Sequence, residues 1–242
     1  MPIFVRTRHI YDSYSDYYKL IELAQFPTCY TEEIDWNSDN TYICSYFNFP
    51  KNDNGFDPFP EHTCRMIFWD LERYEEGKVI DERFDEHWVS DRWYAEKLVG
   101  STYVTLGTDG LCPDIELSKR FDFAHMAYMT HRREHIVNWF KDNGMKIAPN
   151  AWGEDRHKAI LQSKAMLCTH QDEMPMMEPL RYALAVSYEL PILAEYCEDF
   201  YPFEKGMEMI LPGDYRLYWL NYPKENYQFK PLVLQALGEH ED

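Results

Sequence analysis

The sequence predicts an α/β protein made of two Rossmann-like domains, each with a parallel sheet, that face a shared cleft. Short apolar runs alternate with amphipathic helical stretches through both halves of the chain, a pattern typical of parallel sheets with helices on both faces. A cluster of turn residues at 107–114 interrupts this alternation and predicts an interdomain linker. The 242 residues provide for two domains of roughly 100 to 120 residues, each large enough to bury a core.

The strands and helices of the first half follow from local residue patterns. β-branched and aromatic residues gather in short runs, as strands require, and these predicted strands lie at residues 3–5, 41–47, 65–69, 87–90 and 103–106. Apolar residues at helical spacing predict helices at 17–24 and 91–99, the second with an acidic start. Turn-forming residues dominate 51–60, which we expect to be a loop.

The second half repeats this alternation. Its predicted strands lie at residues 121–126, 145–148, 165–168, 191–194 and 208–211. Its predicted helices lie at 132–143, at 154–162, in the segment after Pro175, at 215–220 and at 231–237. We therefore expect an N-terminal α/β domain over residues 1–108, a second α/β domain over 109–215 and a C-terminal helical tail over 216–242.

The charge balance restricts the classes of partner. The chain has 24 basic and 42 acidic residues, a net charge of −18, whereas a protein that binds duplex DNA nonspecifically needs a basic surface. DNA remains a possible partner only if a basic strip around Arg6, Arg8, Lys51 and Arg65 faces the cleft. No apolar run is long enough for a membrane span, and the first residues turn polar too soon for a signal peptide. We expect a cytoplasmic protein.

Motif absences narrow the possible chemistry. Six cysteines are widely spaced without a CxxC pair, and two lie within apolar runs, which favours buried free thiols over disulfides or a zinc site. Neither GxSxG nor GxGxxG is present, so a hydrolase or a dehydrogenase is a weaker interpretation. Aromatic residues make up 17% of the chain, a composition that serves core packing and also suits stacking on a sugar or base.

The stretch 163–195 is the most informative part of the chain. A short apolar run is followed by a polar loop, an amphipathic helical segment with Glu178 and Arg181, and a second apolar run. This order predicts a strand, loop, helix and strand whose polar residues gather where the first strand ends. In an open α/β sheet, ligands bind at the carboxyl ends of the strands.

Four segments taken in order carry a resemblance to a known family. They are VTLGTDG, FDFAHMAYMTHRREHIVNWFKDNGMKIAP, AWGEDRHKAILQSKAMLCTH and EMPMMEPLRYALAVSYELPILAE. This series resembles the C-terminal half of GT-B-fold glycosyltransferases over roughly residues 102–215. In that family an arginine-bearing helix start and a later glutamate-bearing helix hold the nucleotide-sugar donor. The N-terminal half resembles the family only in its alternating architecture. The resemblance implies that the domain over 109–215 binds the donor and that the domain over 1–108 is the acceptor side.

The resemblance implies a set of donor-binding residues. Arg132 and Arg133 match the basic pair that meets the donor diphosphate, where a helix N-terminus also favours an anion. Glu178 matches the glutamate that accepts hydrogen bonds from ribose hydroxyls. The alternatives are solvated arginines and a simple ion pair between Glu178 and Arg181, three residues further along the helix. The donor-side set further includes Arg181, Gly107, Asp109 and His170.

The sequence also departs from the pattern of the family. Retaining members carry two glutamates about seven residues apart with glycines nearby, whereas here Asp172 and Glu173 precede Glu178 and a serine, Ser187, begins the stretch where a glycine turn is usual. The sequence is therefore compatible with transfer that retains the configuration of the sugar and with transfer that inverts it.

Transfer of the sugar requires stabilisation of the leaving diphosphate, which arginines and a helix N-terminus can supply. No DxD triplet is present, so we expect no catalytic metal and no cofactor besides the donor. Inversion would need a general base, and loops after N-terminal strands offer His9, Asp12, Asp16, Asp70 and Asp91. Asp70 is the preferred catalytic candidate because it ends a strand beside Trp69, with His9 and Asp12 next. Surface polarity or helix capping is the alternative for each.

Two histidines, His125 and His131, lie near the arginine pair and serve either to bind phosphate or to fill structural roles.

The sequence therefore predicts a glycosyltransferase that moves a sugar from a nucleotide-sugar donor, UDP-glucose by expectation, to a hydroxyl acceptor such as a glycan or a modified DNA base. A non-catalytic module that binds a nucleotide or nucleotide sugar is the alternative, because the N-terminal half is short and the expected glycines are missing.

Overall fold

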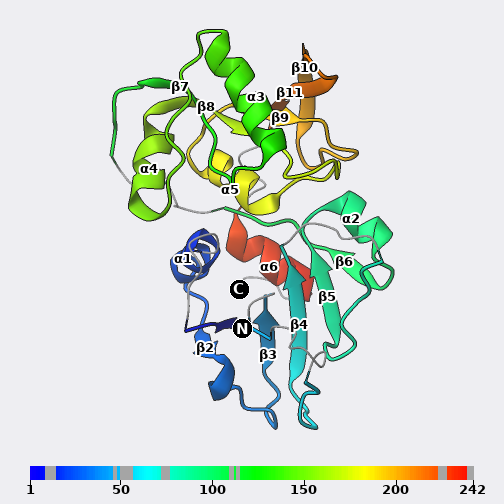
Figure 1. Ribbon diagram of the computed structural model, residues 1–242. Helices are drawn as coiled ribbons and strands as arrows, with labels where there is room; N and C mark the ends of the chain where they lie inside the picture. The colour runs from blue at the N-terminus through cyan, green and yellow to red at the C-terminus, as the bar shows by residue number, and fades with distance from the viewer. Residues whose placement is uncertain are drawn as a thin grey trace. The chain divides into compact units, whose positions relative to one another are not determined.

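A computed structural model describes residues 1–8, 15–45, 48–49, 57–71, 77–108, 112, 115–222 and 228–238. The chain forms two compact units (Figure 1). The first unit comprises Met1–Thr105 together with Lys230–Asp242, and the second comprises Leu106–Phe229. The end of the chain therefore belongs to the same unit as its beginning.

The first unit contains a six-stranded sheet in which all neighbouring strands are parallel. Its strands, in the spatial order β2-β1-β3-β4-β5-β6, are β2 (Thr28–Tyr30), β1 (Ile3–Arg6), β3 (Thr41–Cys44), β4 (Arg65–Asp70), β5 (Glu86–Val89) and β6 (Ser101–Tyr103). Within its described residues, this unit has the helices α1 (Ser15–Leu23), the short 3-10 helix η2 (Thr31–Glu33), α2 (Arg92–Lys97) and α6 (Phe229–Leu237).

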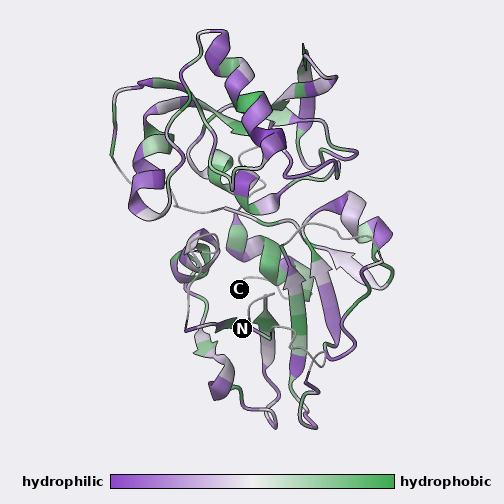
Figure 2. Ribbon diagram, viewed as in Figure 1, coloured by the Kyte–Doolittle hydropathy of each residue, from purple (hydrophilic) through white to green (hydrophobic). Residues whose placement is uncertain are grey.

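The central strands of this sheet are buried on both faces, as parallel strands require. Ile43, Ile67, Trp69 and Trp88 are fully buried, and Figure 2 shows β4 as largely hydrophobic along its length. Asp91 caps α2 by accepting a hydrogen bond from the backbone N–H of Tyr94. The capping alternative for Asp91 is therefore the one that the structure shows.

The second unit contains a mixed five-stranded sheet, so the expectation of a parallel sheet is wrong in part for this unit. Its strands, in the spatial order β10-β11-β9-β8-β7, are β10 (Glu204–Leu211), β11 (Tyr215–Asn221), β9 (Ile192–Glu195), β8 (Ser163–Cys168) and β7 (Phe121–Ala124). β7, β8 and β9 are parallel, whereas β11 is antiparallel to both β9 and β10. The helices in the described part of this unit are α3 (His131–Asp142), α4 (Gly153–Leu161) and α5 (Pro179–Ser187).

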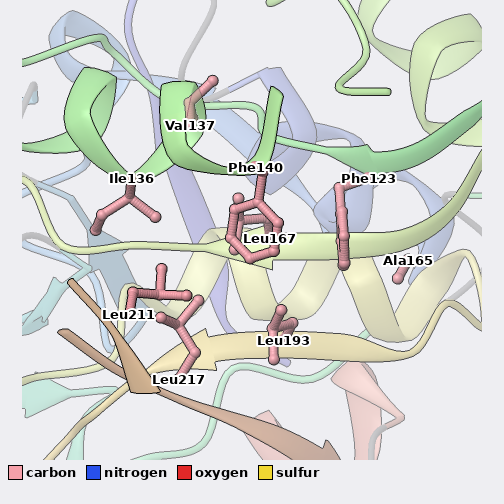
Figure 3. Packing of buried hydrophobic residues seen from close by; sticks show 9 residues of the cluster. All are labelled: Phe123, Ile136, Val137, Phe140, Ala165, Leu167, Leu193, Leu211 and Leu217. Atoms are coloured by element: carbon pink, nitrogen blue, oxygen red, sulfur yellow. The ribbon is translucent and has the colours of Figure 1, made fainter. Parts of the chain in front are cut away.

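The core of the second unit lies between α3 and the sheet. Ile136 and Phe140 of α3 pack against Leu167 of β8, Leu193 of β9 and Leu217 of β11 (Figure 3). Because these side chains are buried, α3 is held with its first turn at the carboxyl ends of the parallel strands, and that position sets up the polar cluster described below.

The predicted helix at 215–220 is wrong, because these residues form most of β11. Tyr215, Leu217 and Trp219 alternate along one face of the strand and pack on the core. The turn before them has positive φ angles at Gly213 (87°) and Asp214 (62°), as a tight hairpin needs. The expected helical tail over 216–242 therefore begins as a strand, and the helix within its described residues is α6.

Smaller differences concern strand limits. The strand predicted at 103–106 lies earlier, as β6, and the strand predicted at 145–148 is reduced to an isolated bridge between Ile147 and Phe123. β2 had no prediction. The other predicted strands and helices are present within a few residues of their expected limits, except that the part of the 41–47 strand beyond Ser45 and most of the 51–60 loop lie outside the described residues.

Candidate functional site

Polar residues gather at the carboxyl ends of β7, β8 and β9 in the second unit. His125 follows β7, Thr169 and His170 follow β8, and Glu195 is the last residue of β9. α3 begins after the first of these strands, and α5 begins after the second. Parallel strands end at the same edge of a sheet, which is the usual position of ligands in open α/β sheets.

Arg133 is at the centre of this cluster and has a side chain that is 1% exposed. Its Nε and Nη2 donate to the carbonyl oxygen of Thr169 at 3.2 and 3.1 Å, and its Nη1 donates to the carbonyl oxygen of Tyr128 at 2.8 Å. Nη2 also donates to Oε1 of Glu178. Arg133 therefore ties the loop after β7, the loop after β8 and the start of α5 together.

Glu178 lies between two guanidinium groups. Its Oε1 pairs with Arg133, and its Oε2 pairs with Arg181, whose Nη1 donates to the Thr169 carbonyl at 2.7 Å. Glu178 is the N-cap residue of α5, and Pro179 takes the first helical position, where proline is well tolerated. The ion pair with Arg181 that the sequence left open is thus present, together with a second pair to Arg133.

Arg132 makes a separate ion pair with Glu195. Its two terminal nitrogens donate to the two carboxylate oxygens, with Nη1 at 2.6 Å from Oε2. The guanidinium also lies over the ring of Tyr215, 4.9 Å from the centroid. Glu195 is buried, and its Oε2 accepts a further hydrogen bond from the backbone N–H of His170 at 2.9 Å. The arginine side chain stays 21% exposed.

The peptide group between Thr169 and His170 connects these two ion-pair systems. Its carbonyl oxygen accepts from Arg133 and Arg181, and its N–H donates to Glu195. Every polar atom of this peptide is therefore bound by a charged side chain. The start of the polar loop is fixed more firmly than backbone hydrogen bonds alone would fix it, because hydrogen bonds to charged groups are stronger.

Burial and the arginines keep the neighbouring histidines neutral. Burial, together with the charges of Arg181 and Arg133, lowers the pKa of His125 to about 3. Its Nε2 lies 2.9 Å from Oγ1 of Thr169. Burial also lowers the pKa of His170, whose Nε2 lies 2.6 Å from the carbonyl oxygen of Tyr196. Neither ring adds positive charge to the site at neutral pH.

The charges of the cluster do not balance. Three arginines face the two carboxylates of Glu178 and Glu195. Burial and then the charge of Arg181 lower the pKa of Arg133 to about 10, which still leaves it protonated at neutral pH. Among the described residues the exposed Glu173 also acts electrostatically on Arg132. Arg132, Arg133 and Arg181 together thus have one positive charge more than Glu178 and Glu195 neutralise, in a chain whose net charge is −18.

Asp70, the preferred catalytic residue of the sequence interpretation, lies in the first unit and is fully buried. Its Oδ2 accepts from the Tyr94 hydroxyl at 2.7 Å and lies 2.6 Å from Nζ of Lys78 and 3.6 Å from Nε2 of His87. Burial would raise the pKa of Asp70, but His87, Lys78 and Tyr94 together hold it below its usual value. A buried carboxylate with a lowered pKa is a weak general base.

Other candidate residues are dispersed or lie outside the described part. Asp16 is buried in α1, and His131 is exposed at the start of α3. Gly107 is buried near the start of the second unit and has no hydrogen bond to the arginine cluster among the described residues. His9, Asp12 and Asp109 lie outside the described residues.

The basic strip considered for DNA binding is already neutralised where it is described. Arg6 pairs with Glu22, Arg8 pairs with Glu32, and Arg65 pairs with Glu86. Lys51 lies outside the described residues. The three described arginines therefore give no surplus of positive charge for phosphates.

Sequence reasoning missed Glu195 and the Thr169 carbonyl oxygen. Glu195 had a visible signal, because a charged residue closes the otherwise apolar strand ILAE. A charge at the end of a buried strand usually requires a buried partner. The Thr169 carbonyl had no such signal, since every residue offers a backbone acceptor.

Several further features bear on chemistry. All six cysteines are free, and Cys44, Cys64, Cys168 and Cys197 are buried. Within the described ranges no group of three or more His, Cys, Asp or Glu side chains is arranged to hold a metal ion. In the same part of the chain, no helix has the length and apolar character that crossing a membrane demands.

Comparisons with known proteins are sparse. The chain matches no protein-family model and no solved structure. It is 29% identical over 84 residues to an uncharacterized protein of Acanthamoeba polyphaga mimivirus, an alignment that covers 33% of this chain and 28% of the viral protein. The chain thus aligns with little more than a quarter of the length of that relative.

Proposed function

We propose that this protein is a glycosyltransferase whose second unit binds a nucleotide-sugar donor, UDP-glucose in the first instance. The observation that carries the proposal is the Arg133–Glu178–Arg181 group at the carboxyl edge of β8, next to the start of α3. This group presents a carboxylate that is partly open to solvent, and the neighbouring Arg132 adds a positive charge that is also partly exposed. These are the two properties needed to bind a phosphorylated ribose.

The diphosphate would bind at the first turn of α3. This helix is 12 residues long, and Thr130 caps it by accepting from the backbone N–H of Arg133. The other N–H groups of the first turn and the positive end of the helix dipole favour an anion. Arg132 extends from the same turn, and its two hydrogen bonds to Glu195 leave three of its five N–H groups for a ligand. The same donors would stabilise the charge that develops on the leaving diphosphate.

The ribose would bind at Glu178. A carboxylate offers about four lone-pair positions, and the two arginines occupy one on each oxygen. The side chain is 29% exposed, so the remaining positions are open to the two neighbouring hydroxyls of a ribose. The ion pairs with Arg133 and Arg181 are therefore compatible with donor binding.

A non-catalytic nucleotide-binding module is the second candidate, and the surroundings of Asp70 favour it. Asp70 is fully buried and engaged by Lys78 and Tyr94, so it is poorly placed to remove a proton from an acceptor. An enzyme would then need a different base from the first unit. The acceptor is proposed to carry a hydroxyl group; duplex DNA is disfavoured by the net charge of −18 and by the paired arginines.

The proposal is tested first by binding. Isothermal titration calorimetry with UDP, GDP, ADP and inorganic pyrophosphate is expected to give the tightest binding for UDP. Replacing Arg132 with Gln should weaken UDP binding about 10-fold or more, because a hydrogen bond to a charged group contributes about 1.5–3 kcal/mol. Lys158→Gln, on the exposed face of α4, is the control and should bind UDP like the wild type. Failure of every nucleotide to bind would end the proposal.

A second measurement separates an enzyme from a binder. Incubation with UDP-glucose is followed by quantifying released UDP, with and without a hydroxyl acceptor. Slow release of UDP that Arg132→Gln suppresses supports the transferase. Tight binding of UDP-glucose with no release above that of buffer supports the non-catalytic module.

A further inference from the structure

We infer that Arg133 and Arg181 are positioning residues that act through Glu178 and make the site selective for ribonucleotides over 2′-deoxyribonucleotides. This inference rests on the proposed function, because it assigns the sugar of the nucleotide to Glu178. The resemblance implies that Arg133 contacts the diphosphate, and the inference replaces that role with positioning of Glu178.

The donors of Arg133 are almost all used within the protein. A guanidinium group has five N–H donors. Four hydrogen bonds from Arg133 go to Thr169, Tyr128 and Glu178. With a side chain that is 1% exposed, Arg133 has neither the surface nor the donors for a diphosphate. Arg132, the adjacent residue, has both.

Arg181 holds Glu178 from the other side. It also donates to the carbonyl oxygen of Thr169, which accepts from Arg133 as well. Each arginine donates to a different oxygen of the Glu178 carboxylate. Two fixed donors on two oxygens set the plane of the carboxylate as well as its position. An unrestrained glutamate side chain would lose conformational entropy when a ligand binds. The side chain of Glu178 has already lost this entropy upon folding.

A carboxylate held in this way is suited to a vicinal diol. Both hydroxyls of a ribose can donate to it at once, while a 2′-deoxyribose offers one hydroxyl fewer and leaves a carboxylate lone pair without a donor. Sites built to bind a hydroxyl reject analogues that lack it for this reason. The selectivity depends on the orientation of the carboxylate, and hence on the forked geometry of the two arginines, which an ammonium group does not reproduce.

The test measures the affinities of UDP and 2′-deoxy-UDP by calorimetry for three proteins. The wild type is expected to bind UDP on the order of 10-fold more tightly than 2′-deoxy-UDP, as loss of a charged hydrogen bond implies. Arg133→Lys is expected to bring this ratio close to one, with the affinity for 2′-deoxy-UDP little changed. Arg132→Lys, the matched control on the next residue, should weaken both ligands in parallel and keep the ratio.

Three results would overturn the inference. Equal binding of both ligands by the wild type would show that Glu178 does not distinguish ribose from 2′-deoxyribose. UDP binding itself would still support the proposed function. An Arg133→Lys variant that loses affinity for both ligands in the same proportion would assign Arg133 to the diphosphate. Absence of UDP binding in the wild type would remove the proposed function and the inference together. If circular dichroism shows that Arg133→Lys does not fold, the same affinity ratio is measured for Arg181→Lys, because Arg181 donates to the other oxygen of Glu178.

Discussion

At the scale of single residues, ion pairs hold the charges at the carboxyl ends of β8 and β9, and some of these charges are buried. Glu195 is buried and accepts from Arg132 and from a backbone N–H. An unpaired charge at such a position would cost several kcal/mol. His125 is buried near the same arginines, so adding a proton to its ring is unfavourable in the folded chain.

The low pKa of His125 predicts that acid destabilises the protein. The pKa is about 3 in the folded chain and 6.5 in an ordinary histidine, so between these values the unfolded chain binds a proton that the folded chain does not. The stabilising contribution of His125 is therefore complete above pH 6.5 and is lost as the pH falls toward 3. The expected slope is up to about 1.4 kcal/mol per pH unit in the free energy of unfolding. Urea unfolding at a series of pH values measures it.

His125→Gln removes this titration and keeps a donor for Thr169, so its stability should fall less steeply between pH 6.5 and 4 than that of the wild type. His131→Gln, on an exposed residue at the start of α3, is the control and should retain the wild-type slope. Equal slopes for the wild type and His125→Gln would contradict the assignment.

The sequence could predict only the local part of the candidate site. Glu178 and Arg181 are three residues apart on a predicted helix, a spacing that brings side chains together. Arg133 is 45 residues from Glu178, and their contact depends on the packing of α3 and α5 around the sheet. The local spacing of residues in the sequence does not predict how α3 and α5 pack. The role of the Thr169 carbonyl oxygen is equally invisible, since it depends on where two distant arginines point.

At the scale of elements, the hairpin of β10 and β11 differs from the prediction of a helix at 215–220. Tyr215, Leu217 and Trp219 alternate as in a strand. The preceding Pro212, Gly213 and Asp214 form a three-residue connection between the paired Leu211 and Tyr215, a length typical of hairpins. A strand with the pattern apolar, polar, apolar was therefore available from the sequence.

Gly206 is a specific requirement of this hairpin. A Cβ atom at this position would lie 2.8 Å from the backbone oxygen of Trp219 in β11, at the place where the register of β10 and β11 shifts. Gly206→Ala should therefore destabilise the protein by about 1–3 kcal/mol through overpacking against the backbone. Urea unfolding measures the loss, and hydrogen exchange should locate it in β10 and β11.

The neighbouring Met207 provides the comparison. Its side chain is 68% exposed, so Met207→Ala should change the free energy of unfolding by no more than about 0.5 kcal/mol. A Gly206→Ala variant as stable as Met207→Ala would show that β10 can shift to accept the added carbon.

At the scale of the whole molecule, the path of the chain joins distant segments into one unit. The chain leaves the first unit after Thr105 and returns at Lys230, so α6 completes a unit that begins at the N-terminus. Val233 and Leu234 of α6 are buried. Burial of such side chains contributes about 1.5–3 kcal/mol each, and the first unit should depend on this helix.

Truncation after Tyr222 removes α6 and tests this dependence. Hydrogen exchange of backbone amides is expected to accelerate in β3 and β4 of the first unit, while β8 and β9 of the second unit keep their protection. A chain truncated after Gly238, which retains α6, is the control. Loss of protection confined to the second unit would be the opposite of the expected result.

The architecture was predictable to the level of α/β class and parallel strands. Continuous apolar runs identify strands that are buried on both faces, and β3, β4, β8 and β9 follow this rule. The antiparallel direction of β10 and β11 depends on a different signal, the three-residue connection between them, because parallel strands need a much longer crossover. The return of α6 to the first unit has no local signature.

The peptide group between Thr169 and His170 has one more consequence. Resonance in a peptide moves electron density from nitrogen to oxygen. Cationic donors at the oxygen and an anionic acceptor at the N–H, as found here, both favour the charge-separated form. The hydrogen bonds at the two ends therefore strengthen each other, and the link resists twisting. The carbonyl oxygen of Gln171 is also held, by the hydroxyl of Thr130. Movement of the polar loop around a ligand must accordingly begin beyond Gln171.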